Sequence, residues 1–258
     1  MEGYNALTLK DYRAYYRSFA PESVMERRIN PLTGSEELGS PLLSALGARW
    51  ILTQRLLPDD RFPLRLRGRF RVHENPSALP RAYLAEEILS APGDPEGAVA
   101  LLRARGPGSR VAVVEKALSP LPPGRAGEGS VGEWLARNGG GETAIDPAAP
   151  LEGTVLIVSR EPERVVIDCA ADRARMLVLT DAYYPGWKAA IDGRPAGIHR
   201  VNRIFRGVVL PPGVHRVEFA YRPLSLSAGA ALSLLALAAL AVRGRARSKA
   251  LRAPGECR

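Results

Sequence analysis

The stretch LVLTDAYYPGWKAAIDGRP, residues 177–195, decides how the C-terminal half of the sequence is interpreted. Apolar runs on both sides of its YYPGW segment are typical of β-strands. The dipeptide Asp192-Gly193 suits a hairpin turn that requires positive φ. The stretch therefore predicts two strands joined by an aromatic turn and followed by a tight hairpin.

The same pattern continues on both sides of this stretch. Short apolar runs alternate with turn segments rich in Pro, Gly and Glu. The expected strands are 154–159, 164–168, 176–180, 188–191, 196–201, 204–210 and 214–221. About seven strands over about 70 residues predict a seven-stranded β-sandwich domain at 151–222.

The N-terminal half has a mixed pattern. A helical lead-in is expected at 1–47, a small α/β domain at 48–118 and a Pro/Gly-rich linker at 119–150. The expected elements are helices at 9–17 and 36–46, a loop at 30–34, a strand at 49–53, a hairpin with one buried face at 64–74, a strand at 81–88, a helix at 95–105 capped by Asp94, a strand at 111–115 and a helix at 131–137. The predicted fold class is therefore α+β and mainly β.

A long apolar segment, LSLSAGAALSLLALAALAV at 224–242, follows the predicted sandwich. It has no charge and no proline, and its length is close to the roughly 20 residues that cross a bilayer. A helix at the end of a soluble domain would normally show a polar face, whereas this segment is apolar all round. We therefore expect one transmembrane helix at 224–242.

The basic tail at 243–258 orients this helix. Its six basic residues and one acidic residue account for five of the nine net positive charges. The positive-inside rule predicts a cytoplasmic tail and an extracytoplasmic location for residues 1–222, with the helix in the cytoplasmic membrane. The N-terminus has no apolar signal segment, so we expect either the end of a longer polytopic protein or a tail-anchored protein with a cytoplasmic body. The charge bias favours the first.

Three small residues of the apolar segment, Ser225, Gly229 and Ser233, recur at a spacing of four. They would share one helix face, a pattern that lets membrane helices approach each other closely. Such spacing also arises by chance in an Ala-rich helix. Packing against other transmembrane helices is one interpretation of this face.

The remaining composition predicts no catalytic, metal or cofactor site. The other arginines are mixed with acidic residues, which predicts no nucleic-acid partner. His73, His199 and His215 stand singly in strand-like surroundings, and Cys169 lies in a predicted strand, where a core role is expected. Neighbouring acidic residues would point to opposite faces of a strand and could not act as an acid–base pair.

With these elements placed, residues 177–188 and 191–195 resemble the C-terminal signature of the bacterial YfhO family of multispanning membrane proteins. Further resembling blocks lie at 46–53, 74–82, 202–207, 212–219 and 221–223, so the resemblance covers roughly 42–242. It implies a relative of GT-C lipid-linked-sugar glycosyltransferases that modify cell-envelope polymers. The catalytic acid of such enzymes belongs to an early loop between membrane helices, so no catalytic residue is carried over to this chain.

The resemblance implies a noncatalytic extracytoplasmic C-terminal domain that contacts a polymer or a lipid-linked sugar. A stand-alone membrane-anchored protein-interaction module is the alternative. We expect no enzymatic activity of this chain alone.

The aromatic turn carries the candidate site residues Asp181, Tyr183, Tyr184 and Trp187. Aromatic faces stack on the C–H surfaces of sugars, and a carboxylate accepts hydrogen bonds from sugar hydroxyls. Alternatively, the turn plugs one end of the sandwich, with Asp181 as a cap of the turn and a Pro-Gly pair that sets its geometry. Both interpretations, ligand site and structural plug, follow from the same residues.

Overall fold

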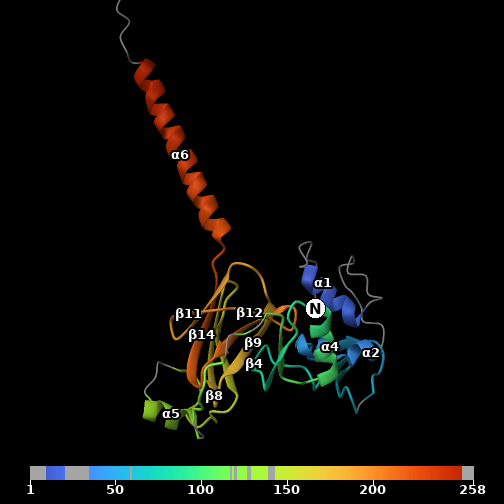
Figure 1. Cartoon of the computed structure of the whole chain (residues 1–258). Helices are drawn as coiled ribbons and strands as arrows, with labels where there is room; N and C mark the ends of the chain where they lie inside the picture. Colours follow the sequence, from blue (N-terminus) through green and yellow to red (C-terminus); the bar gives the residue numbers. More distant parts are fainter. Residues whose placement is uncertain are drawn as a thin grey trace, which may run out of the picture.

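The computed structural model describes residues 10–20, 35–58, 60–116, 118, 121–126, 129–138 and 143–251. The loop predicted at 30–34 and the tail beyond 251 lie outside these residues. Figure 1 shows a body made mainly of β-strands, with α1, α2 and α4 on one side and the long helix α6 projecting away from it. The prediction of a mainly β fold with a few helices is confirmed.

The N-terminal half contains short elements in the predicted order, except that the helix expected at 36–46 and the strand expected at 81–88 are each divided in two; the two parts of that strand pair with different strands. The elements are α1 (Lys10–Phe19), α2 (Ser35–Leu38), α3 (Pro41–Ala45), β1 (Trp50–Thr53), β2 (Leu64–Arg67), β3 (Arg71–Glu74), β4 (Ala82–Leu84), β5 (Glu87–Ser90), α4 (Pro95–Arg105), β6 (Val111–Val114) and α5 (Val131–Asn138). The predicted helix at 36–46 is divided because Ser40 caps a new helix, α3, at Leu42. Asp94 caps α4 as predicted, since its side chain accepts a hydrogen bond from the Gly97 amide.

The C-terminal half contains more strands than predicted. They are β7 (Thr154–Arg160), β8 (Arg164–Ala171), β9 (Arg175–Ala182), β10 (Trp187–Ile191), β11 (Arg194–Ala196), β12 (His199–Val201), β13 (Phe205–Leu210) and β14 (Gly213–Tyr221). The prediction of seven strands is wrong because the strand expected at 196–201 is divided. Its first part, β11, pairs with β10, and its second part, β12, pairs with β13 in the other sheet. The chain thus crosses between two sheets within this short segment.

Two large sheets form the body. A five-stranded sheet has the order β11-β10-β14-β8-β7, and a six-stranded sheet has the order β4-β9-β13-β12-β6-β5. The β4, β5 and β6 strands come from the region before residue 119, and β4 and β6 pair with β9 and β12 of the later region. The predicted α/β and sandwich regions therefore share one continuous sheet.

Side chains of the six-stranded sheet alternate between two cores. Leu177 and Leu179 of β9 pack between the two sheets, whereas Met176 and Val178 pack against the helices on the other face. All four are fully buried. This period of two places β9 between two apolar layers, with α4 contributing Ala98, Val99 and Leu102 to the outer layer.

A small third sheet has the order β1-β3-β2. The hairpin predicted at 64–74 forms as β2 and β3, but its expected burial is only partly present. His73 is buried, and its Nδ1 lies 2.7 Å from the Phe62 carbonyl oxygen. Leu66 is 63% exposed, because one face of this sheet has no layer packed on it.

The helix α6 (Leu224–Leu251) is longer than the predicted 224–242 segment. It continues through the basic residues because Arg, Lys and Ala are good helix formers. Its described side chains, at 224–225, 228–241 and 243, are all exposed. Among the residues that the structure describes, no helix combines the length and the apolar character that crossing a membrane requires. The segment predicted as a transmembrane helix is therefore observed as a helix but not as a span.

Candidate functional site

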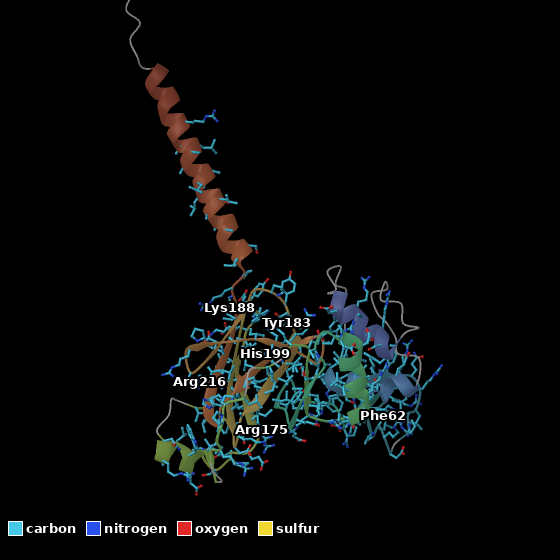
Figure 2. All side chains as sticks on the ribbon, viewed as in Figure 1. Phe62, Arg175, Tyr183, Lys188, His199 and Arg216 are labelled. Carbon is cyan, nitrogen blue, oxygen red and sulfur yellow. The ribbon has the colours of Figure 1, made fainter. Side chains whose placement is uncertain are left out.

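The aromatic turn at 183–186 lies at the end of the sandwich from which α6 leaves. Trp187 at the start of β10 pairs with Tyr221 at the end of β14. The Arg222 amide donates a 2.7 Å hydrogen bond to the Gly186 carbonyl oxygen, which ties the turn to the segment that leads into α6. Figure 2 shows Tyr183 and Lys188 at this end of the body, near the base of α6.

The geometry of this turn depends on Gly186. Its φ of +105° lies in the region that side chains rarely adopt. A Cβ atom at this position would lie 2.8 Å from the Tyr221 ring and 3.3 Å from Pro223. Gly186 therefore suits this turn for two reasons: its backbone conformation is one that other residues rarely adopt, and a side chain would collide with Tyr221.

Asp181 binds two arginines. Its carboxylate accepts hydrogen bonds from Arg81 at 2.8 Å and from Arg206 at 2.9 Å. The Arg206 side chain is only 2% exposed, and its guanidinium carbon lies 3.7 Å from the centroid of the Trp187 ring. Burial lowers the pKa of Arg206 to about 10, against the opposing effect of Asp181. Asp181 and Trp187 thus both contact the buried Arg206 at this end of the sandwich.

Tyr183 and Tyr184 line a cavity of about 230 Å³. The cavity joins three parts of the chain, namely α1, the aromatic turn and the loop between β12 and β13. Its lining residues are Asp11, Tyr12, Ala182, Tyr183, Tyr184, Pro185, Arg200, Arg203 and Ile204. Tyr184 is 45% exposed, so part of its ring is available to a molecule from solution.

Two arginines of the β12–β13 region shape this cavity. The Arg200 guanidinium lies 5.1 Å from the centroid of the Tyr183 ring and pairs with Asp11 at 2.9 Å. Arg203 is 8% exposed, and its Nη1 pairs with Glu96 at 2.9 Å. Its Nε is buried and has no hydrogen-bond partner among the described residues. An unsatisfied buried donor of this kind is costly, and it lies in a residue that lines the cavity.

The backbone beside Arg203 adopts an unusual conformation. Asn202 and Arg203 have φ values of +50° and +70°. Asn202 is fully buried, and its side chain accepts from the Val113 amide at 2.7 Å and donates to the Tyr83 hydroxyl at 3.1 Å. These bonds hold two consecutive left-handed residues beside the cavity, and strain of this kind is concentrated at functional sites.

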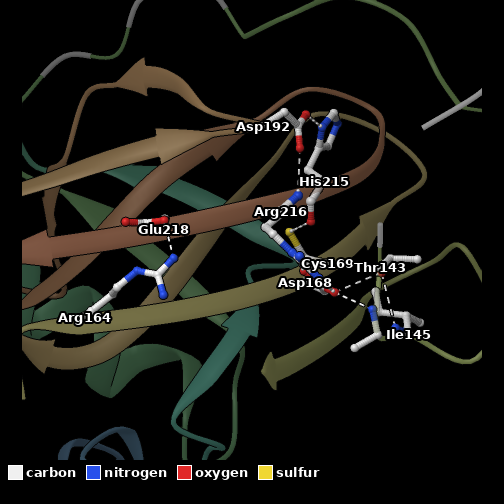
Figure 3. A network of polar contacts seen from close by, with 10 residues as sticks. Thr143, Ile145, Arg164, Asp168, Cys169, Asp192, His215, Arg216 and Glu218 are labelled. Carbon is white, nitrogen blue, oxygen red and sulfur yellow. Dashed lines mark hydrogen bonds and ion pairs between the residues drawn. The ribbon is translucent and has the colours of Figure 1, made fainter. Parts of the chain in front are cut away.

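A second polar cluster lies on the five-stranded sheet (Figure 3). Asp168 is fully buried and accepts from both Arg216 and the Thr143 hydroxyl. Burial alone would raise the pKa of Asp168, but the hydrogen bonds from Arg216, the Ala144 amide and Thr143 hold it below its ordinary value of 3.8. This cluster attaches the 143–145 segment to the sheet, which is a structural role.

His215 and Cys169 have local partners in the five-stranded sheet. His215 Nδ1 lies 2.7 Å from Asp192, and burial lowers the pKa of His199. Cys169 is fully buried and burial raises the pKa of its thiol, which disfavours the reactive thiolate. Over the described part of the chain, no group of three or more His, Cys, Asp or Glu residues is arranged to hold a metal ion.

The predicted helix-packing residues Ser225, Gly229 and Ser233 lie on α6 and are exposed. No described heavy atom outside the helix lies within 4 Å of a Cβ placed on Gly229. Packing of this face against a further helix remains a prediction.

Four charged or aromatic residues of the cavity lining were not predicted as site residues from the sequence: Asp11, Tyr12, Arg200 and Arg203. Asp11 and Arg200, which form an ion pair, are separated by 189 positions. Arg203 belongs to a block that the family resemblance included, but no local pattern in α1 points to this cavity.

Comparison with known protein families gives a match, and the matched residues include the aromatic turn. The family model described as "Bacterial membrane protein YfhO" matches residues 153–233, from the start of β7 into α6. No curated protein and no solved structure matches the chain. The matched segment contains all four predicted residues of the aromatic turn. Residues 153–233 are therefore similar to the YfhO family of bacterial membrane proteins, as the resemblance in the sequence predicts.

Proposed function

We propose that this chain provides a noncatalytic extracytoplasmic domain that holds a saccharide at the membrane surface. The saccharide would belong to a cell-envelope polymer or to a lipid-linked sugar. The observation that carries the proposal is the cavity beside Tyr183 and Tyr184, which opens at the end of the body from which α6 leaves.

The chemistry of the cavity favours a sugar ring. Tyr12, Tyr183 and Tyr184 provide aromatic surface, and Asp11 and the two cavity arginines provide hydrogen-bonding groups. Sugar-binding sites combine these two kinds of group, because sugars have apolar C–H faces and many hydroxyls. A volume of about 230 Å³ suits one sugar ring.

The same cavity lacks the groups of a glycoside-cleaving site. Its described lining contains one carboxylate, Asp11, and that group is already paired with Arg200. Hydrolysis of a glycosidic bond typically requires two carboxylates on opposite sides of the bond. The arrangement therefore supports binding of a saccharide and not its hydrolysis.

Membrane attachment is assigned to α6. Leu232, Leu235 and Leu240 of this helix are 66–68% exposed, and Figure 1 shows α6 projecting away from the body. A basic segment follows them, and basic residues favour the cytoplasmic side of a membrane. The proposal therefore places residues 1–222 outside and 243–258 inside, with the face that contains Ser225 and Gly229 directed at other membrane helices.

Saccharide binding is tested by saturation-transfer NMR on the full chain in detergent micelles. The probes are glucose, galactose and N-acetylglucosamine. We expect transfer from the protein to at least one sugar, and loss of this transfer in Tyr184→Ala. The matched control is Trp50→Ala, which removes an exposed aromatic ring far from the cavity. Transfer that is absent for all three sugars, or unchanged in Tyr184→Ala, would sink the proposal.

Topology is tested with a reporter that is active only outside the cytoplasm, fused at Ala220 in a bacterial host. The fusion is made with and without the reading frame upstream of this chain. Activity that requires the upstream frame supports an extracytoplasmic domain of a longer membrane protein. Inactivity in both contexts would place the body in the cytoplasm and contradict the assignment.

A second candidate function is a stand-alone membrane-anchored protein-interaction module. The observation that favours it is the exposed apolar face of the three-stranded sheet, where Leu52 and Leu66 are 67% and 63% exposed. Soluble surfaces rarely leave aligned apolar side chains uncovered unless they bind a partner.

A further inference from the structure

The strand β2 is an open edge of the three-stranded sheet. It pairs with β3 alone among the described strands. Its residues Arg65, Leu66 and Arg67 are all exposed. An open edge presents unpaired backbone N–H and C=O groups, to which another extended chain can add as a strand.

An apolar row crosses this sheet and ends at the open edge. Val72 of β3 pairs in register with Leu52 on one side and with Leu66 on the other. Trp50 lies on the same face as Leu52, because it is two residues away on the same strand. Trp50 is 57% exposed. The row thus continues to the point where an added strand would place its own side chains.

Arginines line the other face of the same edge and the adjoining turn. Arg67 pairs in register with Arg71, one position along from the apolar pair. Arg49 and Arg65 lie instead toward the apolar face, where both bind Glu74, at 3.0 and 2.7 Å, because Glu74 pairs in register with Trp50. Among the described residues the structure gives no ion pair for Arg67 or Arg69. The edge therefore has an apolar face and a face with uncompensated positive charge.

The position of this edge favours a protein partner over the bilayer. Figure 2 shows Phe62, which closely precedes β2, at the opposite side of the body from the base of α6. A membrane that holds α6 is therefore distant from this edge. Trp and Arg are also the residues most enriched at the energetic centres of protein interfaces.

We propose that β2 accepts an extended segment of a partner protein in which acidic and apolar residues alternate. The backbone of the segment pairs with Leu64–Arg67, its apolar side chains extend the Leu52–Val72–Leu66 row, and its acidic side chains lie beside Arg67. This inference specifies the partner of the interaction-module function. It uses no residue of the saccharide cavity, so the two proposals can fail separately.

Arginines and a register shift are also devices that keep strand edges free of partners, and β2 has both. A protective edge gains nothing from an aligned apolar row, because exposed leucines favour association. The row is therefore the feature that distinguishes a binding edge from a protected one.

The test uses the full chain in detergent micelles and a synthetic nonapeptide of alternating glutamate and valine, labelled with a fluorophore. Binding is followed by fluorescence anisotropy. A peptide with lysine in place of glutamate serves as the charge control. Hydrogen exchange of the β2 amides is measured with and without peptide, because strand addition protects backbone N–H groups.

We expect the glutamate peptide to bind and to slow exchange at β2, and the lysine peptide to do neither. Leu66→Ser and the double variant R67E/R69E should each weaken binding at least about tenfold, as expected for interface residues that contribute strongly. The matched controls are Leu156→Ser, on the edge strand β7 of another sheet, and Arg194→Glu, on β11. Both controls should bind as the parent chain does.

Three outcomes would overturn the proposal. The first is no binding of the glutamate peptide. The second is binding that protects β7 instead of β2. The third is binding by R67E/R69E that equals binding by the parent chain. Preference of the same edge for vesicles of phosphatidylglycerol, with no peptide binding, would assign it to a membrane surface and would equally reject a protein partner.

Discussion

At the residue scale, Gly186 joins the aromatic turn to the start of α6. Replacing it by Ala would place a Cβ in the left-handed region and 2.8 Å from the Tyr221 ring. The backbone conformation alone costs about 1–2 kcal/mol for a residue with a side chain, and the displaced ring adds to this cost. We expect Gly186→Ala to reduce the free energy of unfolding by at least about 2 kcal/mol in urea titrations of the purified chain.

The matched control is Gly193→Ala. Gly193 also has a positive φ, +77°, but nothing lies within 4 Å of a Cβ placed at this position. This variant carries the backbone cost without the steric one, so its loss should be the smaller of the two. Equal losses would mean that contact with Tyr221 contributes nothing.

The buried charge of Arg206 makes Asp181 a sensitive position. Asp181 is the carboxylate that both Arg81 and Arg206 contact. Removing one partner of a buried ion pair leaves an uncompensated charge and typically costs about 3–5 kcal/mol. We expect Asp181→Asn to lower the free energy of unfolding by about 3 kcal/mol in urea titrations.

The double variant D181N/R206M provides the control. It removes the buried guanidinium together with its carboxylate, and Met fills similar space beside Trp187. The double variant should therefore be more stable than Asp181→Asn alone. If the double variant is instead less stable than Asp181→Asn, the Asp181–Arg206 interaction has been assigned too much importance.

At the element scale, Asp168 attaches the 143–145 segment to the five-stranded sheet. Its folded pKa lies below 3.8 because its hydrogen bonds outweigh the effect of burial. A group with a lowered folded pKa contributes stability above its unfolded pKa and loses it as pH falls through the folded value. The contribution should therefore be complete above about pH 4 and decline toward lower pH.

We expect Asp168→Asn to lower Tm at pH 7 and the difference from the parent chain to shrink as pH falls from about 4 to 2. Differential scanning fluorimetry over this range measures both. Glu161→Gln, in the exposed turn between β7 and β8, should follow the parent chain throughout. A difference that stays constant with pH would show that the Asp168 carboxylate does not titrate as assigned.

The elements themselves were largely predictable from local pattern. The hairpin β2–β3, the capped helix α4 and the strands around the aromatic turn follow from alternation, a cap residue and turn residues, which act over a few positions. The division of 196–201 into β11 and β12 was not predictable, because no local signal shows which sheet a residue joins. The exposure of Leu66 was also missed, since alternation predicts an apolar face but not whether another layer covers it.

The candidate site, too, was predicted only where a local sequence pattern marks it. The sequence identified Tyr183 and Tyr184, because their turn has a distinctive composition. It did not identify Asp11 and Arg200, whose ion pair connects α1 to β12 across most of the chain. Strands of one sheet can be close in space and far apart in sequence, and nothing in a local pattern records that pairing.

At the scale of the whole molecule, the two halves of the chain depend on each other. The six-stranded sheet takes β4, β5 and β6 from the first half and β9, β12 and β13 from the second. On its outer face, Met176, Val178, Val201 and Phe205 pack with side chains of the N-terminal helices. A fragment that contains only the second half would expose these residues to water.

This interdependence predicts how truncated chains behave. A fragment of residues 151–222 retains the YfhO-matched strands but loses three strands of one sheet and the layer that covers its outer face. We expect it to show no cooperative thermal unfolding in circular dichroism. A fragment of residues 1–222 loses only α6 and its tail, and the described side chains of α6 are exposed, so this fragment should unfold cooperatively with a Tm close to that of the parent chain. Cooperative unfolding of 151–222 would instead mean that the C-terminal strands form an independent domain and that β4 and β6 are additions to it.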